Sequence, residues 1–117
     1  MSSTSPFDNL PAWDKQAAMA CSGGDADLAR SLLAGLIGQL PDDLAIMRRH
    51  AAAGDLPNLA EKAHKTRGGA VYCGVTALVA ALEQLDLVAR NGDAGKAGEA
   101  LAQVASEIRR LRELNPS

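Results

Sequence analysis

The segment spanning residues 63–74 concentrates the side chains of this chain that are best suited to chemistry. It combines one histidine, two cations and a pair of glycines, namely His64, Lys65, Arg67, Gly68 and Gly69. A neutral imidazole is nucleophilic near neutral pH, and nearby cations stabilise a phosphate-like anion through charge-assisted hydrogen bonds. Glycine costs a helix roughly 1 kcal/mol relative to alanine, so two in succession indicate close approach by another group. The pattern predicts an accessible, reactive histidine with clearance above it.

His64 is predicted to lie on the polar side of its helix. Gly68 follows it by four residues and therefore lies directly over it, where the missing side chain leaves room for another protein. The glycine pair has an alternative explanation, which is close packing against another helix or a local kink. The polar side comprises Glu61, His64, Lys65 and Gly68, and the buried side comprises Leu59, Ala60, Ala63, Ala70 and Cys73.

Asp86 is the candidate partner that orients the histidine. If the chain reverses near Val75, then His64, eleven residues before it, and Asp86, eleven residues after it, lie at similar heights in a helical hairpin. A carboxylate there accepts a hydrogen bond from Nδ1–H of His64, which fixes the tautomer and leaves Nε2 as the nucleophile. The alternative is a solvated Asp86, with Glu83 and Gln84 as further candidates for the orienting role.

The elements that position these residues are predicted to be helices. Alanine and leucine supply most of the apolar content, and only three residues are aromatic, whereas strands favour aromatic and β-branched side chains. Short connections favour antiparallel packing of successive helices. We expect an all-α, up-down four-helix bundle with a short additional N-terminal helix. Residues 11–117 form one domain in this interpretation, and residues 1–10 form a disordered leader or linker.

Cap and turn residues set the expected helix boundaries. The first helix is expected over residues 11–21. Pro41 is expected to break or kink the second apolar run, with Asp42 and Asp43 in a new first turn. The expected N-caps are Asp25, Asp55, Thr76 and Asp93. The expected helix ends are Gly23, Gly24, Gly54, Gly74 and Gly92.

Apolar residues spaced three and four apart give each helix one buried stripe. The early stripe comprises Leu28, Leu32, Leu33, Leu36, Ile37 and Leu40, a later one comprises Val75, Leu78, Val79, Leu82, Leu85 and Ala89, and the last comprises Ala97, Leu101, Val104, Ile108 and Leu111. The charged residues of the last helix are expected to form a solvated face, namely Glu107, Arg109, Arg110, Arg112 and Glu113.

Composition excludes several classes of function. With a formal net charge of −2, the chain lacks the excess of positive charge that nucleic-acid binding requires. No apolar run approaches the roughly 20 residues of a membrane span. Cys21 and Cys73 lack metal-ligand spacing and are expected to be reduced thiols. We expect no metal and no ATP site, because paired ligands and a glycine-rich phosphate loop are both missing. The second histidine, His50, is expected to be a surface residue.

Residues 64–74 resemble the signature of histidine phosphotransfer (HPt) domains. The matching positions are His64, Arg67 where the family usually has lysine, Gly68, Gly69 as a small residue, and Gly74. Supporting similarity extends over about residues 25–113. The stretch around residues 72–75 is similar to the C-terminal HPt domains of hybrid sensor kinases of the GacS/BarA type. Thr66 departs from the family pattern, because a hydrophobic residue is common there.

The resemblance implies a phosphorelay role. His64 would accept a phosphoryl group from an aspartyl phosphate on a receiver domain and pass it to a response-regulator aspartate. Lys65 and Arg67 would stabilise the phosphate, and Mg²⁺ would be supplied by the receiver, so no cofactor is expected on this chain. The partners are therefore receiver domains, with no membrane contact by the domain itself. We expect a cytoplasmic monomer, whether separate or as the C-terminal domain of an inner-membrane sensor kinase.

Two other functions remain open at this stage. The first is a helical bundle that docks receiver domains without being phosphorylated. The second is a structural bundle or a dimerisation domain, which predicts a continuous apolar face around His64. The polar residues expected around this histidine favour phosphotransfer over the structural alternative.

Overall fold

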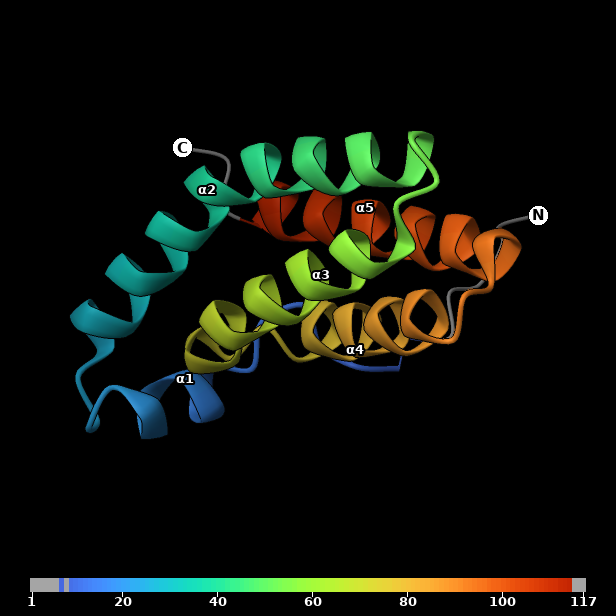
Figure 1. Ribbon diagram of the computed structural model, residues 1–117. Helices are drawn as coiled ribbons and strands as arrows, with labels where there is room; N and C mark the ends of the chain where they lie inside the picture. Colours follow the sequence, from blue (N-terminus) through green and yellow to red (C-terminus); the bar gives the residue numbers. More distant parts are fainter. Residues whose placement is uncertain (1–6, 8, 115–117) are drawn as a thin grey trace.

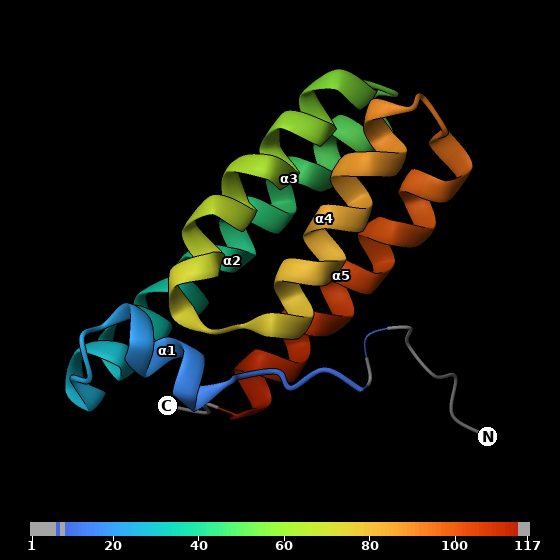
Figure 2. The ribbon, with the colours of Figure 1, turned by 90° about the horizontal axis from the view of Figure 1, so that it is seen from below.

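The computed structural model describes residue 7 and residues 9–114, and this part of the chain is almost entirely helical. In chain order the elements are α1 (Lys15–Cys21), α2 (Ala26–Ala52), α3 (Leu56–Ala70), the 3-10 helix η1 (Val71–Cys73), α4 (Thr76–Arg90) and α5 (Ala94–Leu114). Helices α2 to α5 form a ring in which each packs against the next and α5 packs against α2 (Figures 1 and 2). The expected all-α bundle with a short extra N-terminal helix is confirmed. Most of the expected leader, residues 1–6 and 8, lies outside the described residues.

Aliphatic stripes on α4 and α5 form the centre of the core. Every member of the stripe expected on α5 is buried, and on α4 only Val79 is left partly exposed. Leu78, Leu82 and Leu85 are each no more than 1% exposed. Full burial of a leucine side chain contributes about 1.5–3 kcal/mol, so these stripes supply the main force that holds the hairpin of α3 and α4 onto α5.

Helix α2 continues through Pro41 and bends along its length (Figure 1). Proline lacks a backbone N–H and clashes with the preceding turn, which kinks a helix without necessarily ending it. Beyond the bend the N-terminal half of α2 leaves the bundle and packs against α1 and η1. The early stripe is therefore only partly buried. Leu33 and Leu40 lie in the core, but Leu28 and Leu32 are exposed, contrary to expectation.

Asp43 has a different role from the one its position suggested. Because α2 is continuous, Asp43 lies in the middle of a helix and is buried. Its Oδ1 lies 3.0 Å from Nζ of Lys62 on α3, and it accepts a hydrogen bond of 3.3 Å from the side chain of Gln39. A buried carboxylate requires such partners, so this ion pair fixes α2 against α3 near the middle of the bundle.

Three of the four expected N-caps are confirmed. The side chains of Asp25, Asp55 and Asp93 accept hydrogen bonds from backbone N–H groups three residues later, at 3.0, 3.3 and 3.0 Å. Each satisfies one of the amide groups left unpaired in the first turn of a helix. The pKa of Asp55 is lowered, chiefly because the Asn58 side chain also donates a hydrogen bond to its carboxylate.

The fourth expected cap, Thr76, is wrong. Val75 occupies the N-cap position of α4 and provides no side-chain hydrogen bond, and Thr76 is the first helical residue. The N–H of Ala77 instead donates to the backbone oxygen of Pro11 at 3.1 Å. A segment distant in sequence therefore replaces the local cap.

The first helix begins later than expected, because residues 11–14 contact the turn between η1 and α4 instead of forming a helix. Helix α1 begins at Lys15, after the N-cap Asp14. Residues 10–14 run across the ends of α4 and α5 (Figure 2). The indole N–H of Trp13 donates to the backbone oxygen of Cys73 at 2.9 Å. The N-terminal segment thus ties down the turn between α3 and α4.

Glu107 was expected on a solvated face but is buried, with only 1% of its surface exposed. It follows Val104 by three residues and precedes Leu111 by four, so the helical period places it on the buried stripe. The guanidinium of Arg110 donates to its carboxylate at 2.8 Å and to the backbone oxygen of Leu10 at 3.0 Å. The charge is thereby compensated where α5 meets the N-terminal segment. The other three charged residues of that face are exposed.

Gly74 combines a special backbone conformation with close packing. Its φ is +72°, and its backbone oxygen accepts a hydrogen bond of 2.7 Å from the N–H of Asp14. A Cβ on this residue would lie 2.6 Å from the oxygen of Asp14 and 2.8 Å from the nitrogen of Ala18. Both observations require glycine at the turn between η1 and α4.

We expect Gly74→Ala to lower the free energy of unfolding by about 2–4 kcal/mol, through left-handed strain and displacement of α1. The matched control is Gly54→Ala, which has a similar φ of +70° but no neighbour within 4 Å of the added Cβ. Gly54→Ala should lower the free energy of unfolding only by the backbone strain, about 1 kcal/mol. Urea unfolding of both variants measures the difference, and equal losses would show that the contact with α1 contributes nothing.

Candidate functional site

His64 lies on the outer face of α3, with its side chain 55% exposed. The buried side of the same helix faces the core, with Leu59, Ala60 and Ala63 at 5% exposure or less. The expected division of this helix into a polar and an apolar side is confirmed. The ring is therefore held by a fixed helix and remains reachable from solvent.

Asp86 of α4 lies beside the imidazole. Its Oδ2 is 3.4 Å from Nδ1 of His64, and its side chain is only 15% exposed. The contact is long for a hydrogen bond, as unliganded sites often are before a reacting partner binds. Of the two alternative partners, Glu83 lines the same hollow as His64, whereas Gln84 lines a different one. The geometry leaves Nε2 of His64 directed away from the carboxylate.

Arg90 holds the other oxygen of the same carboxylate. Its Nε and Nη2 donate to Oδ1 of Asp86 at 3.2 and 2.6 Å. Both nitrogens donate to the same oxygen, so Arg90 holds Oδ1 through charge-assisted hydrogen bonds and leaves Oδ2 facing His64. Sequence reasoning did not identify Arg90, although its position four residues after Asp86 on one helix was a usable signal.

A shallow hollow of about 270 Å³ opens at this cluster. Its lining residues are His64, Arg67, Glu83, Asp86, Leu87 and Arg90. Arg67 reaches this hollow because residues three apart are neighbours on a helix surface. Lys65 does not line it, since adjacent residues point about 100° apart, and its Nζ lies 3.7 Å from Glu61. The structure therefore brings together His64, Arg67 and Asp86, and places Lys65 beside them.

Gly68 and Gly69 are exposed and lie within a continuous helix. A Cβ built on either residue meets nothing within 4 Å in the part of the chain that the structure describes. Neither glycine is therefore required for packing between helices, which was the alternative explanation. The space above these residues faces outward, next to the imidazole, where another molecule can enter.

The remaining reactive side chains lie apart from this cluster. Cys21 is exposed on α1, and Cys73 is buried in η1. Burial raises the pKa of the Cys73 thiol, and the second thiol at Cys21 adds a smaller effect in the same direction, so the nucleophilic thiolate is disfavoured. Thr66, the departure from the family pattern, is buried, and its hydroxyl has no hydrogen-bond partner among the described residues.

Two negative findings apply to residues 7 and 9–114. No three histidine, cysteine, aspartate or glutamate side chains in this part lie close enough to hold a metal ion. No helix within the same residues combines the length and the apolar character needed to cross a membrane.

Comparison with known proteins gives consistent matches. Residues 31–114 match the family model of the Hpt domain. The chain is 34% identical over 102 residues to the sensor histidine kinase GacS of Pseudomonas protegens, which covers 87% of this chain and 11% of that protein. It is 32% identical over 98 residues to the sensor protein GacS of Pseudomonas syringae pv. syringae, covering 84% of this chain and 11% of the relative. The chain thus spans about a ninth of these curated relatives. No solved structure matches it.

We expect Asp86→Asn to lower the population of the Nδ1–H tautomer of His64, because the ionised acceptor is lost. A hydrogen bond of this kind is worth about 1 kcal/mol, which corresponds to a roughly fivefold change in the tautomer ratio. Nitrogen-15 NMR of the imidazole measures this ratio. Glu83→Gln is the control, since it removes a charge from the same hollow without touching the ring. An unchanged ratio in Asp86→Asn would show that Asp86 does not orient His64.

Proposed function

Because this chain belongs to the Hpt domain family, we propose that it carries a phosphoryl group on His64 in a two-component phosphorelay. The observation that carries the proposal is an exposed imidazole whose Nδ1 faces Asp86 while the surface above Gly68 is open. The first feature provides a nucleophile with a defined reactive nitrogen. The second gives a folded partner room to place a phosphorus atom next to it.

The transfer uses the neutral imidazole. The lone pair on Nε2 attacks phosphorus in line with the bond to be broken, so the N–P bond forms as the O–P bond of the partner's aspartyl phosphate breaks. The leaving group is the aspartate carboxylate, and the proton on Nδ1 stays in place. The ring gains positive charge as the bond forms, and the Asp86 carboxylate stabilises it. Transition states of this kind are loose, so positioning and charge stabilisation provide most of the catalysis.

Arg67 is proposed to stabilise the transferring phosphoryl group. It lines the hollow beside His64, and its guanidinium has no ion-pair or hydrogen-bond partner among the described residues. Its planar guanidinium can bind two phosphate oxygens at once, whereas an ammonium acts as a compact charge. Lys65 remains a proposed second cation, since its long, exposed side chain can turn from Glu61 towards a bound anion. Mg²⁺ is assigned to the receiver domain in this proposal.

Apolar residues next to His64 provide a docking surface for a receiver domain. Leu87 is 54% exposed and lines the hollow at the imidazole. A second, adjoining hollow of about 710 Å³ includes His64 together with Leu56, Pro57 and Ala60 of α3. Exposed apolar surface of this kind marks sites of protein association. The sequence alone did not identify these residues.

The relatives suggest the setting in which this transfer occurs. One is a sensor histidine kinase and the other a sensor protein, and the matched region is a small part of each. We propose that the donor is a receiver domain of a hybrid sensor kinase and that the acceptor is the aspartate of a response regulator. Phosphohistidine is a high-energy phosphoramidate, so the transfer runs in both directions. A cytoplasmic location and a monomeric state remain part of this proposal.

His64→Ala should abolish labelling by a phosphorylated receiver domain. The control is His50→Ala, because His50 is the other histidine of the chain and lies at the end of α2. That variant should be labelled like the wild type, with a phosphoryl group that is labile in acid and stable in alkali. Binding of several phospho-receivers without any labelling would favour the alternative, a docking bundle that is not phosphorylated.

Gly68→Gln should slow phosphotransfer without weakening the fold. The added side chain points into open space and improves helix propensity, so we expect the free energy of unfolding to rise by about 0.5 kcal/mol. It also displaces the receiver, and misplacement by about 1 Å can cost on the order of 100-fold in rate. The control is Gly98→Gln on α5, which is equally open. An unchanged single-turnover rate of phosphotransfer in Gly68→Gln would show that the receiver does not need the open space above Gly68.

A further inference from the structure

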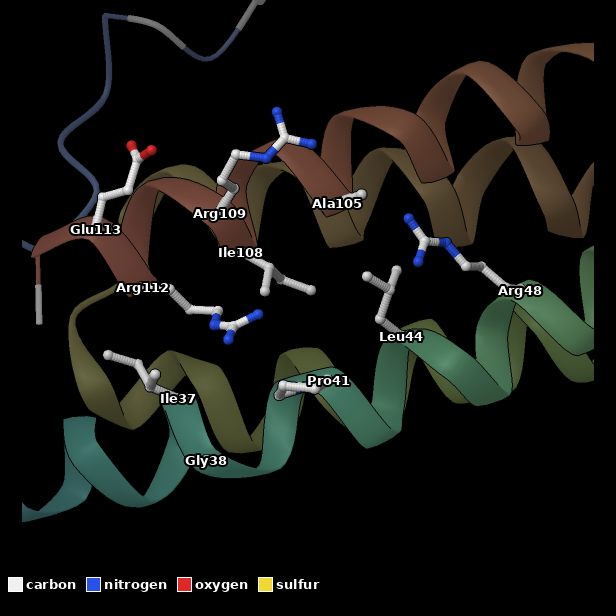
Figure 3. Close-up of a pocket in the computed structure, with 10 residues that line it drawn as sticks. All are labelled: Ile37, Gly38, Pro41, Leu44, Arg48, Ala105, Ile108, Arg109, Arg112 and Glu113. Atoms are coloured by element: carbon white, nitrogen blue, oxygen red, sulfur yellow. The ribbon is translucent and has the colours of Figure 1, made fainter. Parts of the chain in front are cut away.

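A larger groove lies between α2 and α5, away from the histidine (Figure 3). Its volume is about 930 Å³, and it is open to solvent rather than enclosed. Helices α3 and α4 carry His64 and Asp86, and they occupy the opposite side of the ring formed by α2 to α5. A molecule in this groove would therefore leave the imidazole uncovered.

The groove exists because the face of α2 towards α5 has few side chains to fill it. Gly38 and Pro41 both line the groove, and a Cβ on Gly38 would meet nothing within 4 Å. The bend in α2 adds to the separation of the two helices. The opening is thus built from residue types that leave space, and no side chain within the described residues closes it.

Apolar side chains form the middle of the groove. Leu44 of α2 and Ile108 of α5 face each other across it, with Ile37 further along α2 (Figure 3). Leu44 and Ile108 belong to the core and are 9% and 3% exposed, and Ile37 is half-buried. The floor is therefore rigid and apolar, and suits one aliphatic side chain of a partner.

Two guanidinium groups reach into the groove from opposite ends. Figure 3 shows Arg48 extending from α2 towards α5 and Arg112 extending from α5 towards α2, whereas Arg109 points away. The guanidinium groups of Arg48 and Arg112 have no hydrogen-bond or ion-pair partner among the described residues. In contrast, the guanidinium groups of Arg90 and Arg110 are both paired with carboxylates. Glu113 also lines the groove, but its carboxylate points away from α2 in Figure 3. The groove thus presents one guanidinium without an ion-pair partner at each end of an apolar strip.

We propose that this groove binds an acidic segment of a partner protein, with an aliphatic side chain between Leu44 and Ile108 and carboxylates paired with Arg48 and Arg112. The charge pattern selects carboxylates, because guanidinium groups bind them through paired hydrogen bonds. The shape favours a peptide over a small molecule, because enclosed pockets bury most of a small ligand and this groove does not. The lining residues of α2 span roughly 16 Å of helix, which is the length of a short helical segment.

Binding of a segment in this groove does not require phosphorylation of His64. Because the two surfaces lie on opposite sides of the bundle, a partner held in the groove can stay bound while a receiver domain reaches the imidazole. Such a contact raises the local concentration of a partner without competing at the site of transfer.

Fluorescence anisotropy with a synthetic peptide tests the proposal. The probe is a fluorescein-labelled helical peptide of roughly twelve residues, matched to the groove length, in which glutamates flank leucines on one face. Replacing its glutamates with glutamine, or its leucines with alanine, should each weaken binding. The double variant Arg48→Glu and Arg112→Glu should raise the Kd at least about tenfold. The matched control, Arg30→Glu and Arg49→Glu, makes the same charge change on exposed arginines outside the groove and should change the Kd less than about twofold.

Methyl NMR of the unaltered protein provides a test that needs no variant. The peptide should shift the signals of Leu44 and Ile108 and leave Leu87, at the histidine, unchanged. Equal loss of affinity in the two double variants would show general charge attraction and overturn the proposal. Shifts centred on Leu87, or the absence of peptide binding, would overturn it as well. Binding of decyl phosphate at Leu44 and Ile108 without peptide binding would assign the groove to a small amphiphilic anion instead.

Discussion

The antiparallel packing of α3 against α4 is the constraint on which the rest of this molecule depends. Small residues on α3, such as Ala60 and Ala63, allow α4 to approach closely, and the leucines of α4 complete the core behind them. The turn at Gly74 sets the register of the two helices, and the N-terminal segment holds this turn through hydrogen bonds to Gly74, Cys73 and Ala77. With that register fixed, an imidazole and a carboxylate meet on the outer surface.

Pairing of charges explains much of the surface and part of the interior. Asp43, Asp86 and Glu107 are carboxylates with limited exposure, and each faces a cation on the same or the next helix. The Asp43–Lys62 pair joins α2 to α3, and Arg110, which pairs with Glu107 within α5, also donates to the backbone oxygen of Leu10. An unpaired charge at either buried carboxylate would destabilise the fold. The third lies at the site, where Arg90 leaves one oxygen of Asp86 available to His64. The same physical device that stabilises the bundle thus also orients its reactive residue.

The bundle offers different chemistry on its two sides. The side formed by α3 and α4 combines a nucleophile, a cation and clearance, which suits brief approach by a protein that carries a phosphoryl group. The side formed by α2 and α5 combines an apolar strip with unpaired guanidinium groups, which is the basis for the acidic partner segment proposed there. Both surfaces depend on residues that leave space, glycines above His64 in one case and Gly38 with Pro41 in the other. Each of these two openings is therefore a surface at which we propose that another molecule binds.

The sequence by itself determined the class of fold, the stripes of α4 and α5, the N-caps Asp25, Asp55 and Asp93, and the exposure of His64. These features follow from helical periodicity and from local backbone hydrogen bonding. It also pointed to Asp86, through counting along a hairpin. Tertiary structure decided what local rules do not contain. A kinked α2 left Leu28 and Leu32 exposed, contacts from the N-terminal segment replaced Thr76 as a cap, and the packing of that segment on Arg110 allowed the charged Glu107 to be buried. The contact between His64 and Asp86 and the groove between α2 and α5 likewise arise only when separate helices pack, since the energies involved belong to pairs of elements rather than to any one of them.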